Sequence, residues 1–377
     1  MKKLVTMLAG FALALSLVGC SEDAPSATTT TTGAAGDTIY VLGPTPDHGW
    51  TAQAGTYADA KVKEINAAGK YKAQYFASSS AEDQNDVVQT IIANKDAAGV
   101  VFFALDDPAK SGQEALIAAN IPFISFDRII EGPDKSAILN FSGDNWTVGT
   151  GIAYWLQTKG LEPGDVLVTL IGDTGTVSSR RQEGFEQFLL GTRDYQDGAT
   201  GQTYHTSRVW TQAEIDALTA AYKVDCNWSA DNASQFLELQ FPDIIAAGQA
   251  AGGDVYFFSM DDEMTFGVLN VLEGNNLTAE QKADLEALNV YITAVGGMQE
   301  LFDVIAGTAP LSPVSAQYFD DIMSMWFSPV MMQTAIDYMI QYLDKDNWTF
   351  AVGSGQYEPT WIVDKTNVSK FEGFTGH

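Results

Sequence analysis

The sequence contains little cysteine, little histidine and little positive charge, and each scarcity argues against a class of function. Cys20 and Cys226 are the only cysteines among 377 residues, so the chain cannot form a disulfide framework or a cysteine-based zinc site. Lys and Arg total 20 against 48 Asp and Glu, which gives a formal net charge of −28. Nucleic acids and anionic membrane surfaces are bound through clustered cations, so neither is an expected partner. A charge this far from zero predicts a soluble monomer.

Signatures of enzymes are scarce as well. Three histidines and no Gly-x-Ser-x-Gly elbow leave little from which to assemble a catalytic triad. Neither a Gly-x-Gly-x-x-Gly loop nor a Walker loop is present to hold a nucleotide. We therefore expect a protein that is not an enzyme and needs no cofactor and no metal. One enzymatic alternative stays open: the pairs Asp106-Asp107 and Asp261-Asp262 could serve a glycoside hydrolase, although adjacent carboxylates rarely flank a bond from opposite sides.

The N-terminus has the layout of a secretion signal. Two lysines precede an apolar stretch, Leu4–Val18, which is shorter than the roughly 20 residues of a membrane span. The stretch ends at Gly19-Cys20 and resembles the bacterial lipobox, whose cysteine is lipidated. We predict a lipoprotein signal peptide over residues 1–19, a lipid anchor on Cys20 and a flexible tether over residues 20–36. An uncleaved anchor helix is the alternative, and both place the rest of the chain outside the cytoplasm.

From Asp37 onward, short apolar runs alternate with amphipathic stretches, which is the pattern of βαβ units around a parallel sheet. The runs are nearly continuously apolar, as expected for strands buried on both faces. The predicted strands span residues 39–42, 71–76, 100–105, 123–126, 166–171, 255–259, 291–295 and 314–316. Helical spacing of apolar residues predicts helices over 51–65, 83–94, 109–119, 147–157, 178–190, 263–272 and 329–343.

The length of this body favours two doubly wound α/β lobes over one large sheet. We predict an N-terminal lobe from residues 37–143 and 318–347, and a C-terminal lobe from residues 144–317 and 348–377. A three-segment hinge is expected near residues 141–146, 315–319 and 345–352. Residues 191–253 have weaker periodicity and are predicted to be an elaboration of the second lobe.

Charged and aromatic side chains follow several predicted strands, at the edge where open α/β sheets bind ligands. Asp127 and Arg128 come directly after the fourth strand, Asp106 follows the third, and His48 and Trp50 follow the first. Carboxylates and guanidinium groups make paired hydrogen bonds with neighbouring hydroxyls, and aromatic rings cover the apolar face of a sugar. This set of side chains suits a neutral polyhydroxyl compound better than an anion.

Three short motifs occur in the order found in a known family. They are Ile121–Arg128 (IPFISFDR), Arg180–Phe185 (RRQEGF) and Asp261–Met264 (DDEM). In this order they resemble the type I periplasmic sugar-binding proteins of bacterial ABC importers, in particular the ribose, galactose and xylose group, over roughly residues 37–371. The resemblance implies two lobes joined by a three-segment hinge, a monosaccharide or similar polyol bound between them, and delivery of that ligand to an ABC transporter permease.

The resemblance also implies roles for individual residues. Asp127 and Arg128 would bind ring hydroxyls from the first lobe, and Arg181 would reach in from the second. The remaining implied contacts are Asp261 on the ligand, Gln317 at a late strand end beside the hinge, and Trp228 as the stacking aromatic.

The chain departs from the family pattern at three places. Ala104-Leu105-Asp106-Asp107 stands where the family commonly has Asn-Pro-x-Asp, and His48-Gly49-Trp50 replaces frequent paired phenylalanines. Gly296-Gly297-Met298 stands where the family has a ligand-binding Asp. The identity of the sugar therefore does not follow from the resemblance. A sensory protein that binds a nucleoside-like or autoinducer-like ligand and acts on a chemoreceptor or kinase ectodomain is an open alternative on the same scaffold.

Overall fold

The computed structural model describes residues 36–46, 49–273, 277–308 and 317–375. Residues 34–377 form one compact unit. The predicted signal peptide, Cys20, most of the tether, His48 and the predicted strand 314–316 lie outside the described residues. Within the described part of the chain, no helix combines the length and the apolar character needed to cross a bilayer.

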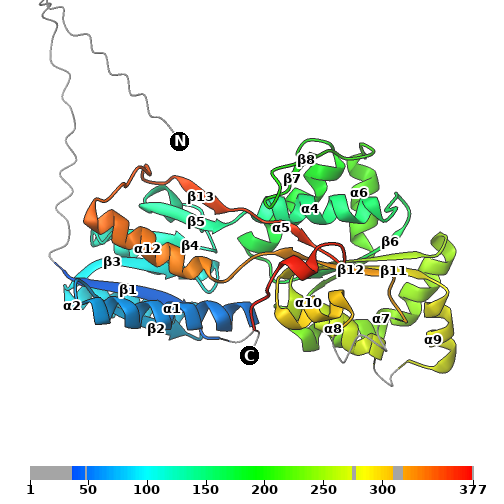
Figure 1. Ribbon diagram of the computed structural model, residues 1–377, viewed down its shortest axis with the longest axis horizontal. Coiled ribbons are helices and arrows are strands. Elements are labelled where there is room, and N and C mark those ends of the chain that lie inside the picture. Colours follow the sequence, from blue (N-terminus) through cyan, green and yellow to red (C-terminus); the bar gives the residue numbers. More distant parts are fainter. Residues whose placement is uncertain (1–35, 47–48, 274–276, 309–316, 376–377) are drawn as a thin grey trace, which may run out of the picture. The chain divides into compact units, whose positions relative to one another are not determined.

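The first lobe is built on a six-stranded parallel sheet in the order β13-β5-β4-β3-β1-β2 (Figure 1). Its strands are β1 (Thr38–Pro44), β2 (Lys72–Ser78), β3 (Ala97–Phe103), β4 (Phe123–Phe126), β5 (Leu139–Gly143) and β13 (Gly355–Glu358). The helices that pack on it are α1 (Gly49–Ala68), α2 (Ala81–Asn94), α3 (Lys110–Ala118) and α12 (Met331–Asp344).

Helices cover both faces of this sheet, and the side chains of β1 show why. Successive residues of a strand point to opposite faces. Ile39 and Val41 belong to the hydrophobic cluster that includes α1 and α12, whereas Tyr40 and Leu42 belong to the cluster that includes α2 and α3. Both sets are almost fully buried. Because both faces of the strand are apolar, the sheet is covered by a layer of helices on each side.

The second lobe repeats this arrangement around a sheet in the order β14-β12-β11-β10-β6-β9. Figure 1 labels β12, β11 and β6 of this sheet. All its neighbouring strands are parallel except β14, which is antiparallel to β12. The strands are β6 (Val166–Ile171), β9 (Tyr222–Asp225), β10 (Asp254–Ser259), β11 (Asn289–Gly296), β12 (Asp321–Trp326) and β14 (Ile362–Val363). The helices are α4 (Asn145–Thr158), α5 (Thr176–Leu189), α6 (Gln212–Ala220), α7 (Ala230–Ala251), α8 (Asp262–Glu273), α9 (Ala279–Glu286) and α10 (Gln299–Ala306).

Much of segment 191–253 belongs to the regular fold, which corrects the prediction of an elaboration. β9 is the edge strand of the second sheet, and α7 leads from it to β10. The strand was missed because its residues are exposed or only half-buried, as an edge strand permits. Helix α7 contains Pro242, which weakens its helical signal.

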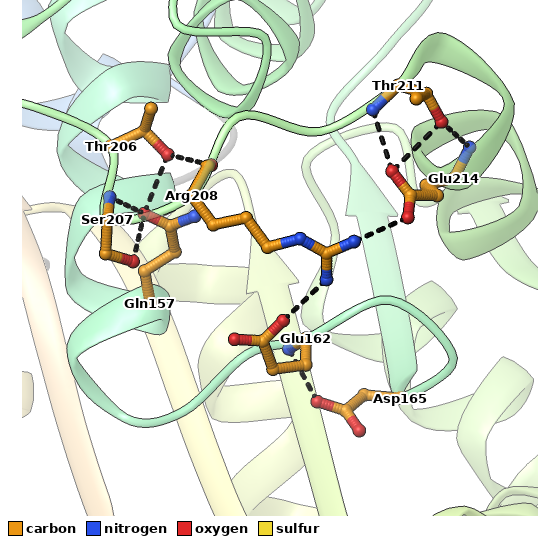
Figure 2. A network of polar contacts seen from close by, with 8 residues as sticks. All are labelled: Gln157, Glu162, Asp165, Thr206, Ser207, Arg208, Thr211 and Glu214. Carbon is orange, nitrogen blue, oxygen red and sulfur yellow. Dashed lines mark hydrogen bonds and ion pairs between the residues drawn. The ribbon is translucent and has the colours of Figure 1, made fainter.

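A polar network holds the part of this segment before β9 to the rest of the lobe (Figure 2). It contains the antiparallel pair β7 (Tyr195–Gln196) and β8 (Thr203–Tyr204), followed by α6. Arg208 forms ion pairs with Glu162 at 2.8 Å and with Glu214 at 2.6 Å. Glu214 also completes a capping box with Thr211 at the start of α6. The network therefore joins this part of the chain to the loop before β6.

Within the residues that the structure describes, the chain passes between the two sheets three times, and two of the predicted crossing points were wrong. The first crossing lies between β5 and α4, inside the predicted 141–146. The second lies between β12 and α12, after residue 326 rather than at 315–319. The third lies between β13 and β14, after residue 358 rather than at 345–352. The second crossing was misplaced because the sequence of β12, DIMSMW, is rich in methionine and poor in the β-branched residues that mark strands. The third was misplaced because β13, an edge strand of exposed and half-buried residues, was not predicted.

The lobe boundaries change accordingly. β12 belongs to the second sheet and β13 to the first. The predicted first-lobe segment 318–347 therefore starts too early, and the predicted second-lobe segment 348–377 also starts too early.

Candidate functional site

A cavity of about 490 Å³ lies where the carboxyl ends of the strands of both sheets meet. Residues at or after the ends of β1, β2, β3 and β4 line it from the first lobe. Residues at or after the ends of β6, β9, β10, β11 and β12 line it from the second lobe. Ligands bind at this edge of open α/β sheets because loops and helix N-termini converge there. The cavity is therefore the candidate functional site.

Seven of the nine residues predicted for the site line this cavity: Trp50, Asp106, Asp127, Arg128, Arg181, Trp228 and Asp261. The position of His48 lies outside the described residues. Gln317 lies elsewhere, exposed in the turn before β12 and thus at the amino end of that strand. It was predicted at a carboxyl end because the strand was placed at 314–316. The residue that follows the real strand is Phe327, which lines the cavity.

Arg128 contacts the second lobe directly. It follows β4 and is 6% exposed. Its Nη2 donates a hydrogen bond to Oδ2 of Asp173, in the loop after β6, at 2.7 Å. Its Nε is buried and has no hydrogen-bond partner among the described residues. Buried polar atoms are nearly always paired, so this donor is available to an acceptor that enters the cavity.

Asp173 is a lining residue that the sequence analysis did not include among its candidates. Its Oδ1 accepts the N–H of Gly175 at 2.8 Å, which shapes the turn before α5. Its Oδ2 accepts both Arg128 and the indole N–H of Trp228, the latter at 3.1 Å. Its position two residues after a buried strand was the available signal, but that position does not show whether an aspartate shapes a turn or pairs with the other lobe.

Trp228 lies in an unusual backbone conformation. Its φ is 59° and that of Asn227 is 48°, both in the left-handed region that bulky residues rarely adopt. The N–H of Trp228 donates to the carbonyl of Gly172 at 3.0 Å. A Cβ on Gly172 would lie 2.3 Å from the indole ring, so this position requires glycine. Such backbone strain is concentrated at functional sites, where the surrounding structure maintains it.

Arg181 lies on α5 and is 4% exposed. Its Nε donates to Oδ1 of Asn145 at 2.8 Å, and its Nη1 donates to the carbonyl of Met260. The guanidinium carbon lies 5.7 Å from the ring centre of Trp228 and 5.1 Å from that of Phe327. Burial lowers the pKa of Arg181 to about 10, an effect that nearby carboxylates oppose. The side chain therefore stays positively charged at neutral pH.

Two aspartates complete the polar lining at strand ends. Asp127 has φ 60°, which Asp tolerates better than most residues, and its N–H donates to the carbonyl of Phe141 at 2.9 Å. Asp261 accepts the N–H of Glu263 on Oδ1 at 2.8 Å, so it stabilises the start of α8 while lining the cavity. Capping and ligand binding are compatible because a carboxylate has four acceptor sites.

Asp262 supports the cavity wall without lining it. This side chain is 1% exposed, and its Oδ2 accepts the N–H groups of Gly297 at 2.6 Å and Met298 at 2.7 Å. Its Oδ1 accepts the hydroxyl of Ser324 at 2.8 Å. Burial raises the pKa of Asp262 to about 6, although these hydrogen bonds act in the opposite direction. Asp262 therefore stabilises the turn at Gly296–Met298, where the sequence lacks the family's ligand-binding Asp.

An aromatic cluster forms the apolar part of the cavity. The indole N–H of Trp50 donates to the carbonyl of Phe327 at 2.6 Å, and their ring centres are 5.6 Å apart. Phe103 packs edge-on against Trp50 at 5.8 Å. All three line the cavity, and Phe103 and Phe327 were missed by the sequence analysis. A Cβ on Gly143 would lie 2.0 Å from the Phe327 ring, so the first and second crossings pack closely here.

Carboxylates outnumber guanidinium groups in the lining. The five carboxylates are Asp106, Asp107, Asp127, Asp173 and Asp261, and the two guanidinium groups are Arg128 and Arg181. Oδ1 of Asp106 is buried and accepts no hydrogen bond from the part of the chain that the structure describes. Burial raises the pKa of Asp106, while Arg128 acts against this rise. The lining thus carries more negative than positive charge. It also contains one buried acceptor, Oδ1 of Asp106, and one buried donor, Nε of Arg128, without hydrogen-bond partners among the described residues.

The comparisons with known proteins agree with this geometry. The family model of the periplasmic binding protein domain matches residues 39–347. The chain belongs to the periplasmic binding protein family. Its members are binding proteins that act outside the cytoplasmic membrane, and the family predicted from the motifs is confirmed. No curated protein matches the chain.

Solved structures confirm the predicted two-lobed α/β fold of this periplasmic binding protein. One is the periplasmic binding protein component of the arabinose ABC transporter from Shewanella sp. ANA-3, which is 17% identical. The alignment covers 88% of this chain and 93% of that chain with a TM-score of 0.63. A second is a galactofuranose binding protein that is 15% identical. The alignment covers 88% of this chain and 96% of that chain, with a TM-score of 0.64. A third is the myo-inositol binding protein from Caulobacter, which is 15% identical. The alignment covers 89% of this chain and 95% of that chain, with a TM-score of 0.62.

Proposed function

We propose that this periplasmic binding protein binds a neutral monosaccharide or similar polyol in the cavity between its lobes and delivers it to an ABC transporter permease. The observation that carries the proposal is the composition of the cavity. Carboxylates and guanidinium groups from both sheets surround a space of about 490 Å³ that is walled by aromatic rings. A cavity of this size is sufficient for a small ligand.

The polar groups suit vicinal hydroxyls. A hydroxyl can donate to the unpartnered Oδ1 of Asp106 and accept from the unpartnered Nε of Arg128, so one class of ligand group satisfies both atoms. The guanidinium of Arg181 and the carboxylates of Asp127 and Asp261 line the cavity as well. The indole of Trp228 supplies an aromatic face for the C–H side of a sugar ring.

The charge balance favours a neutral ligand over an anion. Five carboxylates against two guanidinium groups would repel a sugar acid or a sugar phosphate. The ligands of the similar structures agree with this preference. The Shewanella sp. ANA-3 protein was solved bound to L-arabinofuranose, and a solute binding protein from Mycobacterium smegmatis was solved with bound glycerol. Both compounds are uncharged and rich in hydroxyls.

The remaining parts of the proposal concern location and mode of action. A lipid on Cys20 would hold the protein at the membrane, and residues 20–36 would let the body move between ligand and permease. Ligand contacts from both lobes would favour the closed arrangement, which the permease would recognise. The protein would act as a monomer, need no cofactor and perform no chemical step.

A thermal-shift screen of the body from Asp37 onward tests this function. The panel contains neutral pentoses, hexoses, myo-inositol and glycerol, together with gluconate, glucose 6-phosphate, nucleosides and autoinducers. A ligand at a hundredfold excess over its Kd stabilises the native state by about 2.7 kcal/mol, which raises the melting temperature by several degrees. We expect a neutral sugar or polyol to do so.

The matched control for this screen is Arg128→Ala, in which the shift should disappear because the unpartnered donor is removed. A shift only with nucleosides or autoinducers would favour the sensory alternative. A silent screen, or a sugar shift that persists in Arg128→Ala, would contradict the proposal.

A further inference from the structure

One oxygen atom of Asp173 connects the two lobes. Oδ2 accepts the guanidinium of Arg128, from the first lobe, at 2.7 Å and the indole N–H of Trp228, from the second lobe, at 3.1 Å. Both donors line the cavity. The side chains of Arg128 and Asp173 are 7% and 20% exposed, so the ion pair is largely shielded from water. The attraction between charges shielded in this way is stronger than between charges on the surface, because the surrounding dielectric constant is lower.

The carboxylate of Asp173 is itself held in place. Its Oδ1 accepts the N–H of Gly175 at 2.8 Å and lies 3.4 Å from the hydroxyl of Ser178. The N–H of Asp173 donates to the same hydroxyl at 3.1 Å. Burial acts to raise the pKa of Asp173, but Arg128 and the hydrogen bonds hold it below its ordinary value. Asp173 is therefore an ionised and rigidly placed acceptor at neutral pH.

We propose that Asp173 is a positioning residue that sets ligand affinity by orienting Arg128 and Trp228 and by joining the two lobes. The part that concerns ligand affinity rests on the proposed function. The ion pair leaves Nε of Arg128 unpartnered and directs the group that carries it to the cavity. The second hydrogen bond holds the Trp228 ring, whose backbone is in the left-handed region.

The contact also acts on the equilibrium between open and closed lobes. Arg128 and Asp173 touch each other directly, so their attraction favours the closed arrangement whether or not a ligand is bound. The apparent Kd of a ligand that needs the closed arrangement varies inversely with the closed fraction. Removing the pair should therefore weaken binding and should open the lobes of the protein without ligand.

The test variant is Asp173→Asn, which keeps the shape of the side chain. Its amide oxygen can still accept the N–H of Gly175, but its NH₂ group then faces the donors of Arg128 and Trp228. The matched control is Asp364→Asn, because Asp364 accepts an N–H two residues later, from Thr366 at 2.8 Å, and does not line the cavity. Both variants start from the body that begins at Asp37.

Two measurements are made on each variant. Small-angle X-ray scattering without added sugar gives the radius of gyration, which should be larger in Asp173→Asn than in the wild type and the control. Calorimetry and stopped-flow fluorescence use the sugar that gave the largest thermal shift. We expect a Kd increase of about tenfold or more in Asp173→Asn, mainly through faster dissociation, and less than about twofold in the control.

The outcomes separate this proposal from the proposed function. If no compound binds the wild type, the proposed function fails, and the scattering comparison alone still decides whether Asp173 joins the lobes. An Asp173→Asn variant with wild-type scattering and wild-type Kd would overturn the proposal. If Asp173→Asn does not fold, Asp173→Glu replaces it. Glu keeps the charge but shifts it by one methylene, so it should bind more weakly than the wild type, and unchanged binding and scattering would again overturn the proposal.

Discussion

Replacing Asp262 with Asn should stabilise the protein at neutral pH. The folded state raises the pKa of Asp262 from 3.8 to about 6, mainly through burial. The folded protein therefore binds this proton more tightly than the unfolded chain does. The contribution of this group to stability falls as pH rises from about 4 to about 6, and the full cost is present at pH 7. At about 1.4 kcal/mol per factor of ten, that cost is about 3 kcal/mol.

The hydrogen bonds of Asp262 can be kept in the variant. A single oxygen, Oδ2, accepts the N–H groups of Gly297 and Met298, and an amide oxygen can take its place. The amide NH₂ then faces Ser324, whose hydroxyl can accept instead of donating. Asp262→Asn is neutral at every pH, so it should match the wild type near pH 4 and exceed its free energy of unfolding by up to about 3 kcal/mol at pH 7.

Urea unfolding at pH 4, 5, 6 and 7 measures this difference. Asp231→Asn is the control, because it makes the same substitution at an exposed position in the first turn of α7. The wild-type and Asp262→Asn curves should diverge with rising pH, whereas the control should not show this divergence. A difference between wild type and Asp262→Asn that is constant from pH 4 to pH 7 would refute the reasoning.

Three further predictions concern single side chains. Arg128→Ala should abolish measurable sugar binding in calorimetry while circular dichroism stays unchanged, because the sheets are untouched; unaltered affinity would remove Arg128 from the site. Gly172→Ala should raise the Kd of the sugar about tenfold or more, because its Cβ would displace the Trp228 ring. In a Trp228→Ala background the same substitution should leave the Kd unchanged. An equal rise in Kd in both backgrounds would contradict this prediction. Cys226 is fully buried and its pKa is raised to about 12 by burial, so Ellman's reagent should react with it only in denaturant, and rapid reaction in the native body would disprove the burial.

The sequence alone was sufficient for most of the first lobe and for half of the second. Six strands are nearly continuous apolar runs, which the sequence reveals because both faces of each strand are buried: β1, β3, β4, β6, β10 and β11. β9 and β13 were missed because they lie at sheet edges and alternate between exposed and half-buried residues. The two-residue β14 was missed as well, and so was β5, which is fully buried but has the mixed sequence LNFSG. β12 was misplaced because methionine has no strong preference for strands, and this error moved the second crossing and Gln317. The third crossing was misplaced because β13 was missed.

The residues of the candidate site likewise include some that the sequence predicted and some that it did not. Asp127, Arg128 and Asp261 were predictable because each lies one or two residues after a recognisable strand, and the fold brings such positions to one edge. Phe327 was missed because its strand was misplaced. Asp173 follows a correctly predicted strand, yet nothing local distinguishes an aspartate that shapes a turn from one that pairs with another lobe.

Local sequence thus established the class of fold, the edge of the sheets that carries the site and the types of side chain present there. Those features depend on burial and strand order, which leave a pattern along the chain. Tertiary structure decided the pairing of Arg128 with Asp173, the role of Asp262 in the turn at Gly296–Met298, and the strained position of Trp228 against Gly172. These contacts join residues from different strands or different lobes, and their energies depend on distances that no local pattern contains.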